Sequence, residues 1–292
     1  MRVRATQKEK LAAIRGESWI DTSRHPYIEG DIAWVPVREG LSFDCELPER
    51  NVYSGRGFFM LGDVAVVHGT RPTLPEVEKI VRFRSPCGVL WISNLSDVTR
   101  IPQSEVLWGN IGEISHPENG YEYYFDPCKV MFAQGNLNEK ARMARLISSG
   151  SGDEHVADMF AGIGYFTIPM SGNGAHVHAM EINPVAFEYL KMNITRNGLD
   201  TRVNASLGDC RTSLTGFYDR VVMGHFSAID ILPGVFSHVK TGSTIHVHSI
   251  GEVTDTIQDM VEGAGFSASI QVHKVKKYRP HTWHVVQDVN LS

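Results

Sequence analysis

The segment 156–167 places an acidic residue just ahead of two closely spaced glycines, in the order Val-Ala-Asp-Met-Phe-Ala-Gly-Ile-Gly-Tyr-Phe-Thr. Its apolar start predicts a strand ending at Asp158, and Gly162 and Gly164 predict a tight turn into a helix that a ligand can approach closely. A dinucleotide site would have G-x-G-x-x-G, with a pyrophosphate at the helix N-terminus. Here the third glycine is absent and Asp158 would repel a pyrophosphate. The carboxylate suits instead the ammonium or sulfonium end of S-adenosylmethionine (SAM), contacted directly or through water.

Two further acids end the next two predicted strands. Glu181 can accept hydrogen bonds from both hydroxyls of a ribose, in NAD or in SAM. Asp209 and the neighbouring backbone N–H of Cys210 follow the third strand, where an adenine edge would lie. Each acid alone also fits a simpler interpretation: Asp158 as a helix cap, Glu181 as a solvated strand end, and Asp209 as a turn former. Together they indicate a nucleoside site.

A parallel sheet with crossover helices would bring these acids together, and the C-terminal part of the chain predicts one. From about residue 151, β-rich runs alternate with amphipathic stretches. We predict strands at 155–158, 176–181, 202–206, 219–223 and 244–249. We predict helices at 164–170, 184–196, 228–236 and 253–264, with Pro184 in a first turn and Gly198 as a stop. The runs 267–274 and 282–289 follow without a helix between them and predict an antiparallel hairpin.

The N-terminal part has a different pattern. The runs 63–68 and 88–93 predict strands and 74–83 a helix, whereas 22–30 and 38–47 look like loop or linker. We therefore expect a smaller α+β domain at 1–110, followed at 111–292 by a SAM-binding catalytic domain. The predicted fold of the latter is α/β, a Rossmann-like class I SAM methyltransferase fold whose mixed sheet ends in the antiparallel hairpin.

Composition limits the classes of protein that the chain can belong to. None of its apolar runs approaches the roughly eighteen residues that span a bilayer, and its first ten residues lack a signal-peptide core, so we expect a cytoplasmic protein without a membrane partner. The four cysteines lie far apart, without Cys-x-x-Cys or zinc-ligand spacing, which favours a reducing compartment and no metal. The net charge of −5 argues against nucleic acid, but the excess acid lies in 111–292 and clustering matters more than the total.

Three motifs together are highly specific for one family. They are Asp158-Met-Phe-Ala-Gly-Ile-Gly-Tyr-Phe-Thr-Ile-Pro169, Lys129-Val-Met-Phe-Ala-Gln-Gly-Asn-Leu-Asn-Glu-Lys-Ala-Arg142 and Ser115-His-Pro-Glu-Asn-Gly-Tyr121. Over roughly residues 50–292 the chain resembles the tRNA-modifying group that holds two kinds of enzyme. One is the guanosine-N1 methyltransferase acting next to the anticodon, and the other is the archaeal-type wybutosine-synthesising protein two family of SAM-dependent aminocarboxypropyltransferases.

The segment after the fourth predicted strand favours the second of these enzymes. The methyltransferase is expected to have Asn-Leu-Pro or a similar motif there, whereas this chain has Val221-Val-Met-Gly-His-Phe-Ser227, with Gly224 in place of the asparagine. The resemblance then implies transfer of the 3-amino-3-carboxypropyl group of SAM to C7 of 4-demethylwyosine in phenylalanine tRNA, with release of methylthioadenosine. Alternatives are tRNA guanosine-N1 methylation 3′ of the anticodon, a non-catalytic SAM-fold RNA-binding module, and, weakly, an NAD-linked oxidoreductase.

The resemblance also implies which residues contact SAM. Lys140 is the expected partner of the SAM carboxylate, because it matches the basic position of the family's Glu-basic pair. Many relatives have serine at the position of Ala133, so a contact there would come from the backbone. The full set of expected cofactor contacts is Ala133, Lys140, Asp158, Phe160, Gly162, Glu181, Asp209 and Cys210.

Two residues are candidates for the chemical step. Glu139 matches the glutamate with which the related methyltransferase takes a proton from its guanine. It could equally be a solvent-facing helix residue paired with Arg142 one turn further on. His225 is a second candidate, although packing or substrate binding explains it as well.

The segment 273–284 interleaves cations with aromatic rings and is the candidate RNA-binding surface. Its cations are Lys274, Lys276, Lys277 and Arg279, and its rings include those of Tyr278 and Trp283. On a hairpin turn at the rim of the sheet, such cations can meet phosphates and such rings can stack on an exposed base. A solvated charged turn is the alternative. The expected partner is tRNA, which the N-terminal domain could also contact, and no obligate protein partner is inferred.

Overall fold

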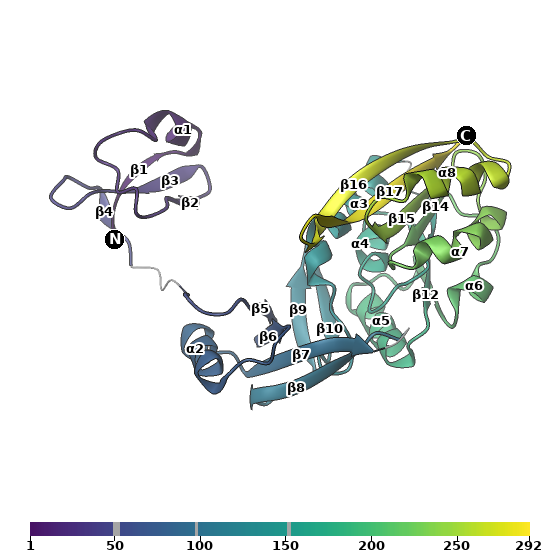
Figure 1. The fold of residues 1–292 in the computed structure, drawn as a ribbon, viewed down its shortest axis with the longest axis horizontal. Coiled ribbons are helices and arrows are strands. Elements are labelled where there is room, and N and C mark those ends of the chain that lie inside the picture. Colours follow the sequence, from purple (N-terminus) through teal and green to yellow (C-terminus); the bar gives the residue numbers. More distant parts are fainter. Residues whose placement is uncertain (49–52, 97–98, 151–152) are drawn as a thin grey trace. The chain divides into compact units, whose positions relative to one another are not determined.

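The computed structural model describes residues 1–48, 53–96, 99–150 and 153–292, and their contacts divide the chain after Ser54 (Figure 1). The two compact units are Met1–Ser54 and Gly55–Ser292. The boundary predicted near residue 110 falls inside the second unit. The reason lies in its apolar core, because Leu61 and Leu90 belong to the same buried cluster as Phe125 and Phe132. Burial of that shared surface unites segments that the sequence pattern separates.

The first unit is a small antiparallel sheet in the order β2-β3-β1-β4. Its strands are β1 (Arg2–Gln7), β2 (Tyr27–Glu29), β3 (Ile32–Pro36) and β4 (Cys45–Glu46), with a 3₁₀ turn at Lys8–Lys10 and helix α1 at Leu11–Ile14. The loop prediction is wrong for β2 and β4. These strands have three and two residues, too few for an alternating pattern to appear in the sequence.

The second unit begins with a four-stranded sheet in the order β5-β6-β7-β8, in which β6 and β7 run parallel. Its elements are β5 (Phe59–Leu61), β6 (Val64–His68), α2 (Leu74–Arg84), β7 (Gly88–Ser96) and β8 (Ile101–Gly109). Helix α2 begins with a capping box, in which the Thr73 side chain accepts from the backbone while Glu76 accepts from the Thr73 N–H. The two strands and the helix predicted here are confirmed.

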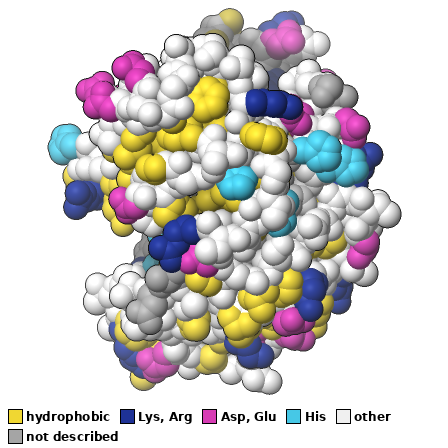
Figure 2. All heavy atoms as spheres, turned by 90° about the vertical axis from the view of Figure 1, so that its right-hand side faces the viewer, with side chains coloured by type: hydrophobic (Ala, Val, Ile, Leu, Met, Phe, Trp, Pro, Cys, Tyr) yellow, Lys and Arg dark blue, Asp and Glu magenta, His cyan; other side chains and the backbone are white. Residues whose placement is uncertain are grey.

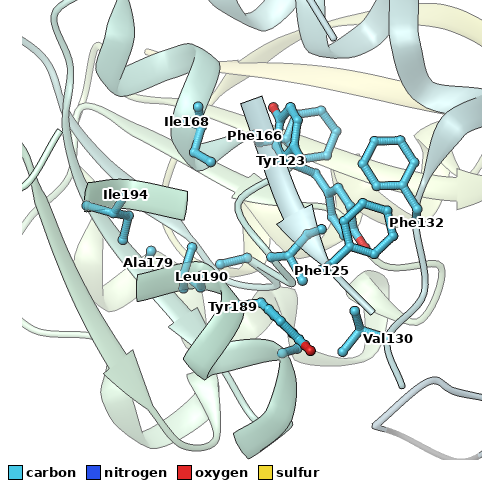
Figure 3. Close-up of a cluster of buried hydrophobic side chains, with 14 of the residues drawn as sticks. Tyr123, Phe125, Val130, Phe132, Phe166, Ile168, Ala179, Tyr189, Leu190 and Ile194 are labelled. Carbon is cyan, nitrogen blue, oxygen red and sulfur yellow. The ribbon is translucent and has the colours of Figure 1, made fainter. Parts of the chain in front are cut away.

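A hairpin and a helix connect this sheet to the main one. The hairpin is β9 (Ile114–Glu118) with β10 (Tyr121–Phe125), followed by a 3₁₀ turn at Gln134–Asn136 and helix α3 (Leu137–Ser149). Strand β10 is tied to the main domain because Asn193 Oδ1 accepts a hydrogen bond from the Tyr124 N–H at 2.7 Å. Figure 3 shows Tyr123, Phe125 and Phe132 in the shared apolar cluster, where the last two rings stack with centroids 5.1 Å apart.

The main sheet has seven strands in the order β13-β12-β11-β14-β15-β17-β16. The parallel strands are β11 (His155–Asp158), β12 (His176–Glu181), β13 (Val203–Leu207), β14 (Arg220–Met223) and β15 (Thr244–Ile250). The antiparallel hairpin is β16 (Ala268–Arg279) with β17 (Thr282–Leu291), and β17 lies next to β15. The predicted mixed sheet and its C-terminal hairpin are confirmed.

Helices cover both faces of this sheet (Figure 1). They are α4 (Thr167–Gly172), α5 (Pro184–Arg196), α6 (Cys210–Ser213), α7 (Ala228–Val235) with a 3₁₀ turn at Phe236–His238, and α8 (Thr254–Gly263). Successive residues of β11 face opposite layers: Val156 belongs to the cluster under α3, α4 and α5, and Ala157 to the cluster under α7 and α8. The strand order reverses between β11 and β14, which is where open α/β sheets bind ligands.

Candidate active site

A pocket of about 980 Å³ lies at the carboxyl ends of β11, β12, β13 and β14. One part of its wall comes from the loop after β11 and from the ends of β12 and β13. Other parts come from the segment 130–136 and the end of β16. Of the site residues predicted from the sequence, the following line it: Ala133, Phe160, Gly162, Glu181, Asp209, Cys210, His225, Lys276 and Lys277. The predicted residues outside this lining are Glu139, Lys140, Asp158, Lys274 and Arg279.

The loop after β11 requires both of its glycines. Gly162 has a φ of +58°, and a Cβ there would approach the Tyr165 ring to 2.4 Å. Gly164 has a φ of +105°, and its Cβ would meet the Ile168 side chain at 2.7 Å. Both the left-handed backbone and the crowding exclude a side chain at either position. At Gly162 the loop therefore presents backbone to the pocket, and its contact with SAM stays a prediction.

Asp158 fixes this loop from behind. It is fully buried, accepts a hydrogen bond from Thr167 Oγ1 at 2.7 Å, and its Oδ1 lies 3.4 Å from the Phe160 N. Burial raises the pKa of its carboxyl to about 6. Because Asp158 does not reach the pocket wall, its contact with SAM stays a prediction. In the structure Asp158 holds Thr167 at the start of α4 and lies beside the backbone N–H of Phe160, which lines the pocket.

Glu181 joins two walls of the pocket through one carboxylate. Its Oε2 accepts from the Gly162 N–H and its Oε1 from the Asn183 N–H, each at 2.7 Å. Burial raises its pKa, and these N–H donors oppose that shift. Each carboxylate oxygen can accept a second hydrogen bond, so Glu181 retains acceptor sites for ribose hydroxyls.

Asp209 and Cys210 form the next part of the wall. Asp209 caps α6 by accepting from the Arg211 N–H at 2.9 Å and also pairs with the Arg211 side chain. Cys210 is buried, and burial raises the pKa of its thiol to about 11, so the thiol stays protonated at neutral pH. This wall can therefore offer a carboxylate and backbone groups to an adenine edge.

Lys140 lies beneath the pocket wall. Its Nζ is 2.6 Å from Glu118 Oε1, and the side chains of both residues are buried. The Nζ also sits 4.5 Å from the centroid of the Phe132 ring and 5.2 Å from that of Tyr165. Burial lowers its pKa, and the Glu118 carboxylate opposes that shift. In the structure Lys140 supports two rings that line the pocket, and its predicted bond to the SAM carboxylate stays a prediction.

Glu139 faces away from the large pocket. Both of its oxygens accept from Arg142, at 2.7 and 2.9 Å, and Arg142 also binds Asp288. The sequence offered a pairing of Glu139 with Arg142 on a solvent-facing side of the helix as the alternative to catalysis. The pairing is present, but the Glu139 side chain is buried. Glu139 lines a separate pocket of about 470 Å³ together with Lys274. Its catalytic role stays a prediction.

His225 stands on the pocket wall against an aromatic neighbour. Its ring stacks on Phe160 with centroids 5.3 Å apart, and its Nδ1 lies 2.7 Å from Ser227 Oγ. Burial, with a smaller contribution from Arg100, lowers the pKa of its imidazole. His225 is therefore neutral at pH 7 and placed to contact a ligand.

The four cations predicted on the hairpin turn lie on β16 itself, because this strand continues to Arg279 and leaves only Pro280 and His281 for the turn. Strand pairing with β17, including Lys277 with Trp283, extends the ladder past the end of the predicted strand. Lys276 consequently points into the pocket wall, where burial and the nearby Arg100 lower its pKa.

Arg100 is a pocket residue that sequence reasoning missed. It has a left-handed φ of +53°, and one terminal nitrogen lies 3.6 Å from the Met131 sulfur. Within the described part of the chain its buried Nε has no hydrogen-bond partner. Such an unpaired donor on a pocket wall suits an anionic ligand group. A single arginine in a turn gives no periodic signal, so the sequence could not single it out.

The described ranges contain neither a candidate metal site nor a candidate membrane-spanning helix. No group of three or more His, Cys, Asp or Glu side chains is arranged there to hold a metal ion. No helix in those ranges has the length and apolar character to cross a membrane.

The doubly wound sheet and the pocket at its strand ends define a Rossmann-like α/β enzyme of the SAM-dependent methyltransferase class.

Comparisons with known proteins give the family. Residues 114–276 match the TRM5/TYW2 methyltransferase domain. The chain is 33% identical over 245 residues to the tRNA(Phe) (4-demethylwyosine(37)-C(7)) aminocarboxypropyltransferase of Methanocaldococcus jannaschii, an alignment spanning 80% of this chain and 96% of that protein. The chain therefore belongs to the TRM5/TYW2 family, as predicted.

Solved structures agree. A crystal structure of M. jannaschii TYW2 in complex with AdoMet superposes with a TM-score of 0.65 at 30% identity, covering 81% of this chain and 99% of that one. Trm5b from Pyrococcus abyssi gives a TM-score of 0.73 at 22% identity and covers 99% of both chains. The second likeness concerns the fold alone, and it extends over the N-terminal unit.

The Glu181→Gln variant is expected to bind SAM about 10- to 100-fold more weakly, because hydrogen bonds to a charged group contribute about 1.5–3 kcal/mol. Isothermal titration calorimetry measures the change. The matched control is Glu188→Gln on α5, an exposed glutamate paired with Lys191 at 2.8 Å. Equal affinities of the two variants would show that Glu181 does not hold the ligand.

The Lys140→Met variant is expected to lose about 3–5 kcal/mol of unfolding free energy, because it leaves Glu118 buried without a counter-charge. The double variant Lys140→Met/Glu118→Leu should recover most of that loss in urea denaturation. If the SAM carboxylate binds to a cation other than Lys140, the double variant, when folded, should keep the SAM affinity of the parent chain. A loss of SAM affinity in the double variant would instead support Lys140 as the partner of the SAM carboxylate.

Proposed function

We propose that this enzyme transfers the 3-amino-3-carboxypropyl group of SAM to C7 of 4-demethylwyosine in phenylalanine tRNA and releases methylthioadenosine. The observation that carries the proposal is the 33% identity to an aminocarboxypropyltransferase over 96% of that protein's length. The pocket supports it, because acids that suit a ribose and an adenine share the wall with cations that suit a carboxylate.

The choice of product depends on orientation. The sulfonium of SAM makes all three attached carbons electrophilic, so the protein selects the product by which carbon it presents to the acceptor. We assign Glu181 to the ribose and Asp209 with Cys210 to the adenine. Arg100 and Lys276 are then the pocket cations for the carboxylate of the amino-acid arm. Holding both ends of SAM leaves the first carbon of that arm, the one bonded to sulfur, to face the base.

Gly224 keeps this part of the pocket open. It follows β14 on the pocket wall, where a Cβ would come within 3.2 Å of the Phe166 ring. The asparagine expected of the sister methyltransferase would fill this space. We infer that the absence of a side chain here leaves room for the amino-acid arm to turn toward the acceptor.

The end of β16 is the proposed contact with tRNA. Lys277 and Arg279 are exposed next to Tyr278, which is 49% exposed and can stack on a base. Lys274 lies 5.5 Å from the centroid of the Trp283 ring. By contrast, the face seen in Figure 2 mixes acidic, basic and apolar side chains without a continuous basic area. We propose that tRNA enters along β16, and that the enzyme works in the cytoplasm without an obligate protein partner.

Transfer of label from SAM distinguishes the proposal from methylation. With SAM labelled in its carboxyl carbon, we expect label in tRNA that carries 4-demethylwyosine, and mass spectrometry should show the mass of an aminocarboxypropyl group together with methylthioadenosine. With SAM labelled in its methyl carbon, the label should stay in methylthioadenosine. Methyl label in tRNA would establish guanosine methylation, and tRNA binding without either product would establish a non-catalytic module.

Removing two phosphate contacts should weaken tRNA binding and its dependence on salt. For Lys277→Ala/Arg279→Ala we expect the magnitude of the slope of log affinity against log salt to fall by about 1.4–1.8, because each neutralised phosphate contributes about 0.7–0.9. Fluorescence anisotropy across a salt series measures this. The control is Lys240→Ala, an exposed lysine paired with Asp219 at 3.3 Å. A slope equal to that of the parent chain would rule out β16 as the phosphate contact.

A further inference from the structure

Two buried histidines form a pair beside the pocket. His248 on β15 is 0% exposed, and His284 on β17 is 1% exposed and lines the pocket. His248 Nδ1 and His284 Nε2 lie 2.9 Å apart. Within the described part of the chain, the other nitrogen of each ring, His248 Nε2 and His284 Nδ1, has no hydrogen-bond partner. Leaving two buried polar atoms unpaired costs stability, which points to a use for them.

Burial keeps this pair neutral. It lowers the pKa of His284 to about 4, with a contribution from Lys276 on β16. It lowers the pKa of His248 well below its ordinary value, where His246 and Arg142 act in the same direction and Asp288 opposes them. Two neutral imidazoles share one N–H across their contact. When the Nε2–H of His284 donates to His248, the Nδ1 of His284 carries a free lone pair.

We propose that His284, supported by His248, accepts the proton that the acceptor base loses when the new carbon–carbon bond forms. This inference rests on the proposed aminocarboxypropyl transfer. It assigns a proton acceptor to a reaction for which Glu139 is poorly placed, since Glu139 lies outside the pocket with both oxygens on Arg142.

A π electron pair of the base forms a bond to the carbon next to the sulfonium, and the carbon–sulfur pair stays on sulfur as neutral methylthioadenosine. The attacked base carbon then holds both hydrogen and the new substituent, and the base is cationic. His284 Nδ1 takes that proton, and the carbon–hydrogen pair restores the aromatic ring. The positive charge of SAM thus leaves the substrates as a proton.

A weak base is sufficient here because a protonated aromatic carbon is a strong acid. A neutral imidazole also suits a pocket that already contains Arg100 and Lys276, where a cationic residue could not accept a proton. Once protonated, His284 can pass its Nε2 proton to His248 Nδ1. Full burial of His248, with His246 and Arg142 nearby, opposes a charge there more than Asp288 favours one, so the proton stays mainly on His284 until it leaves the pocket.

The aromatic neighbours of His284 provide a place for the base. Phe226 packs edge-on against His284 with ring centroids 4.9 Å apart, and Tyr278 packs against Phe226 at 5.6 Å. All three residues line the pocket. A flat tricyclic base can stack on such rings, which would bring its edge to the histidine.

The test is single-turnover transfer by His284→Gln, whose amide can still meet His248 but which lacks the Nδ1 acceptor. We expect the rearomatised product to form about 100-fold more slowly, the size typical of lost acid–base catalysis, with the affinity for methylthioadenosine unchanged. With deuterium at the acceptor carbon, an isotope effect absent from the parent enzyme should appear, because proton loss becomes slow. The control His178→Gln replaces a β12 histidine held by Tyr218 and Ser206 outside the pocket, and should keep the parent rate.

A His284→Gln enzyme with the parent rate, or with a slow rate and no isotope effect, would overturn the inference. If that variant does not fold, as judged by methylthioadenosine binding, His248→Asn replaces it, with the same isotope effect expected and its absence equally contradictory. Transfer by the parent enzyme distinguishes a failure of the proposed function from a failure of the proposed proton acceptor. If it transfers no aminocarboxypropyl group, the proposed function fails, whereas a result confined to the histidine variants concerns only the proton acceptor.

Discussion

The arrangement of the pocket depends on how Glu181 is held. One carboxylate accepts the N–H of Gly162 from the loop after β11 and the N–H of Asn183 at the start of α5. It therefore fixes two walls of the pocket while retaining acceptor sites for a ligand. Because Glu181 is partly buried, these donors also favour its charged form against the effect of burial. A change at Glu181 consequently disturbs the shape of the pocket and its charge together.

The parallel strands of the main sheet supply only one part of the pocket. Their ends hold the groups that suit an adenosine, whereas the cations come from elements outside the parallel strands, Arg100 between β7 and β8 and Lys276 on β16. The buried pair of Lys140 and Glu118 supports Phe132 between these parts. On the proposed assignment of Arg100 and Lys276 to the carboxylate of SAM, this division would let the orientation of SAM change while the adenosine site is kept.

Local patterns made most of the catalytic domain predictable. The strands ending at Asp158 and Glu181 and the α5 helix beginning at Pro184 follow from short apolar runs, acids and caps that lie close in sequence. Contacts between distant residues could not be predicted in the same way. The Glu139–Lys140 pair resembles a solvated helix face, but the fold buries Lys140 against a residue 22 positions earlier. The His248–His284 contact joins residues 36 positions apart, and the division after Ser54 instead of near residue 110 depends on a core shared between segments.

The central claim is that the pocket binds SAM with its adenosine on the acids and its amino-acid arm on the cations. A crystal structure of this chain with SAM tests it most directly. The account predicts the ribose hydroxyls on Glu181, the adenine beside Asp209 and Cys210, and the carboxylate on Arg100 or Lys276. An empty pocket in crystals soaked with SAM, or an amino-acid arm directed away from both cations, would contradict it.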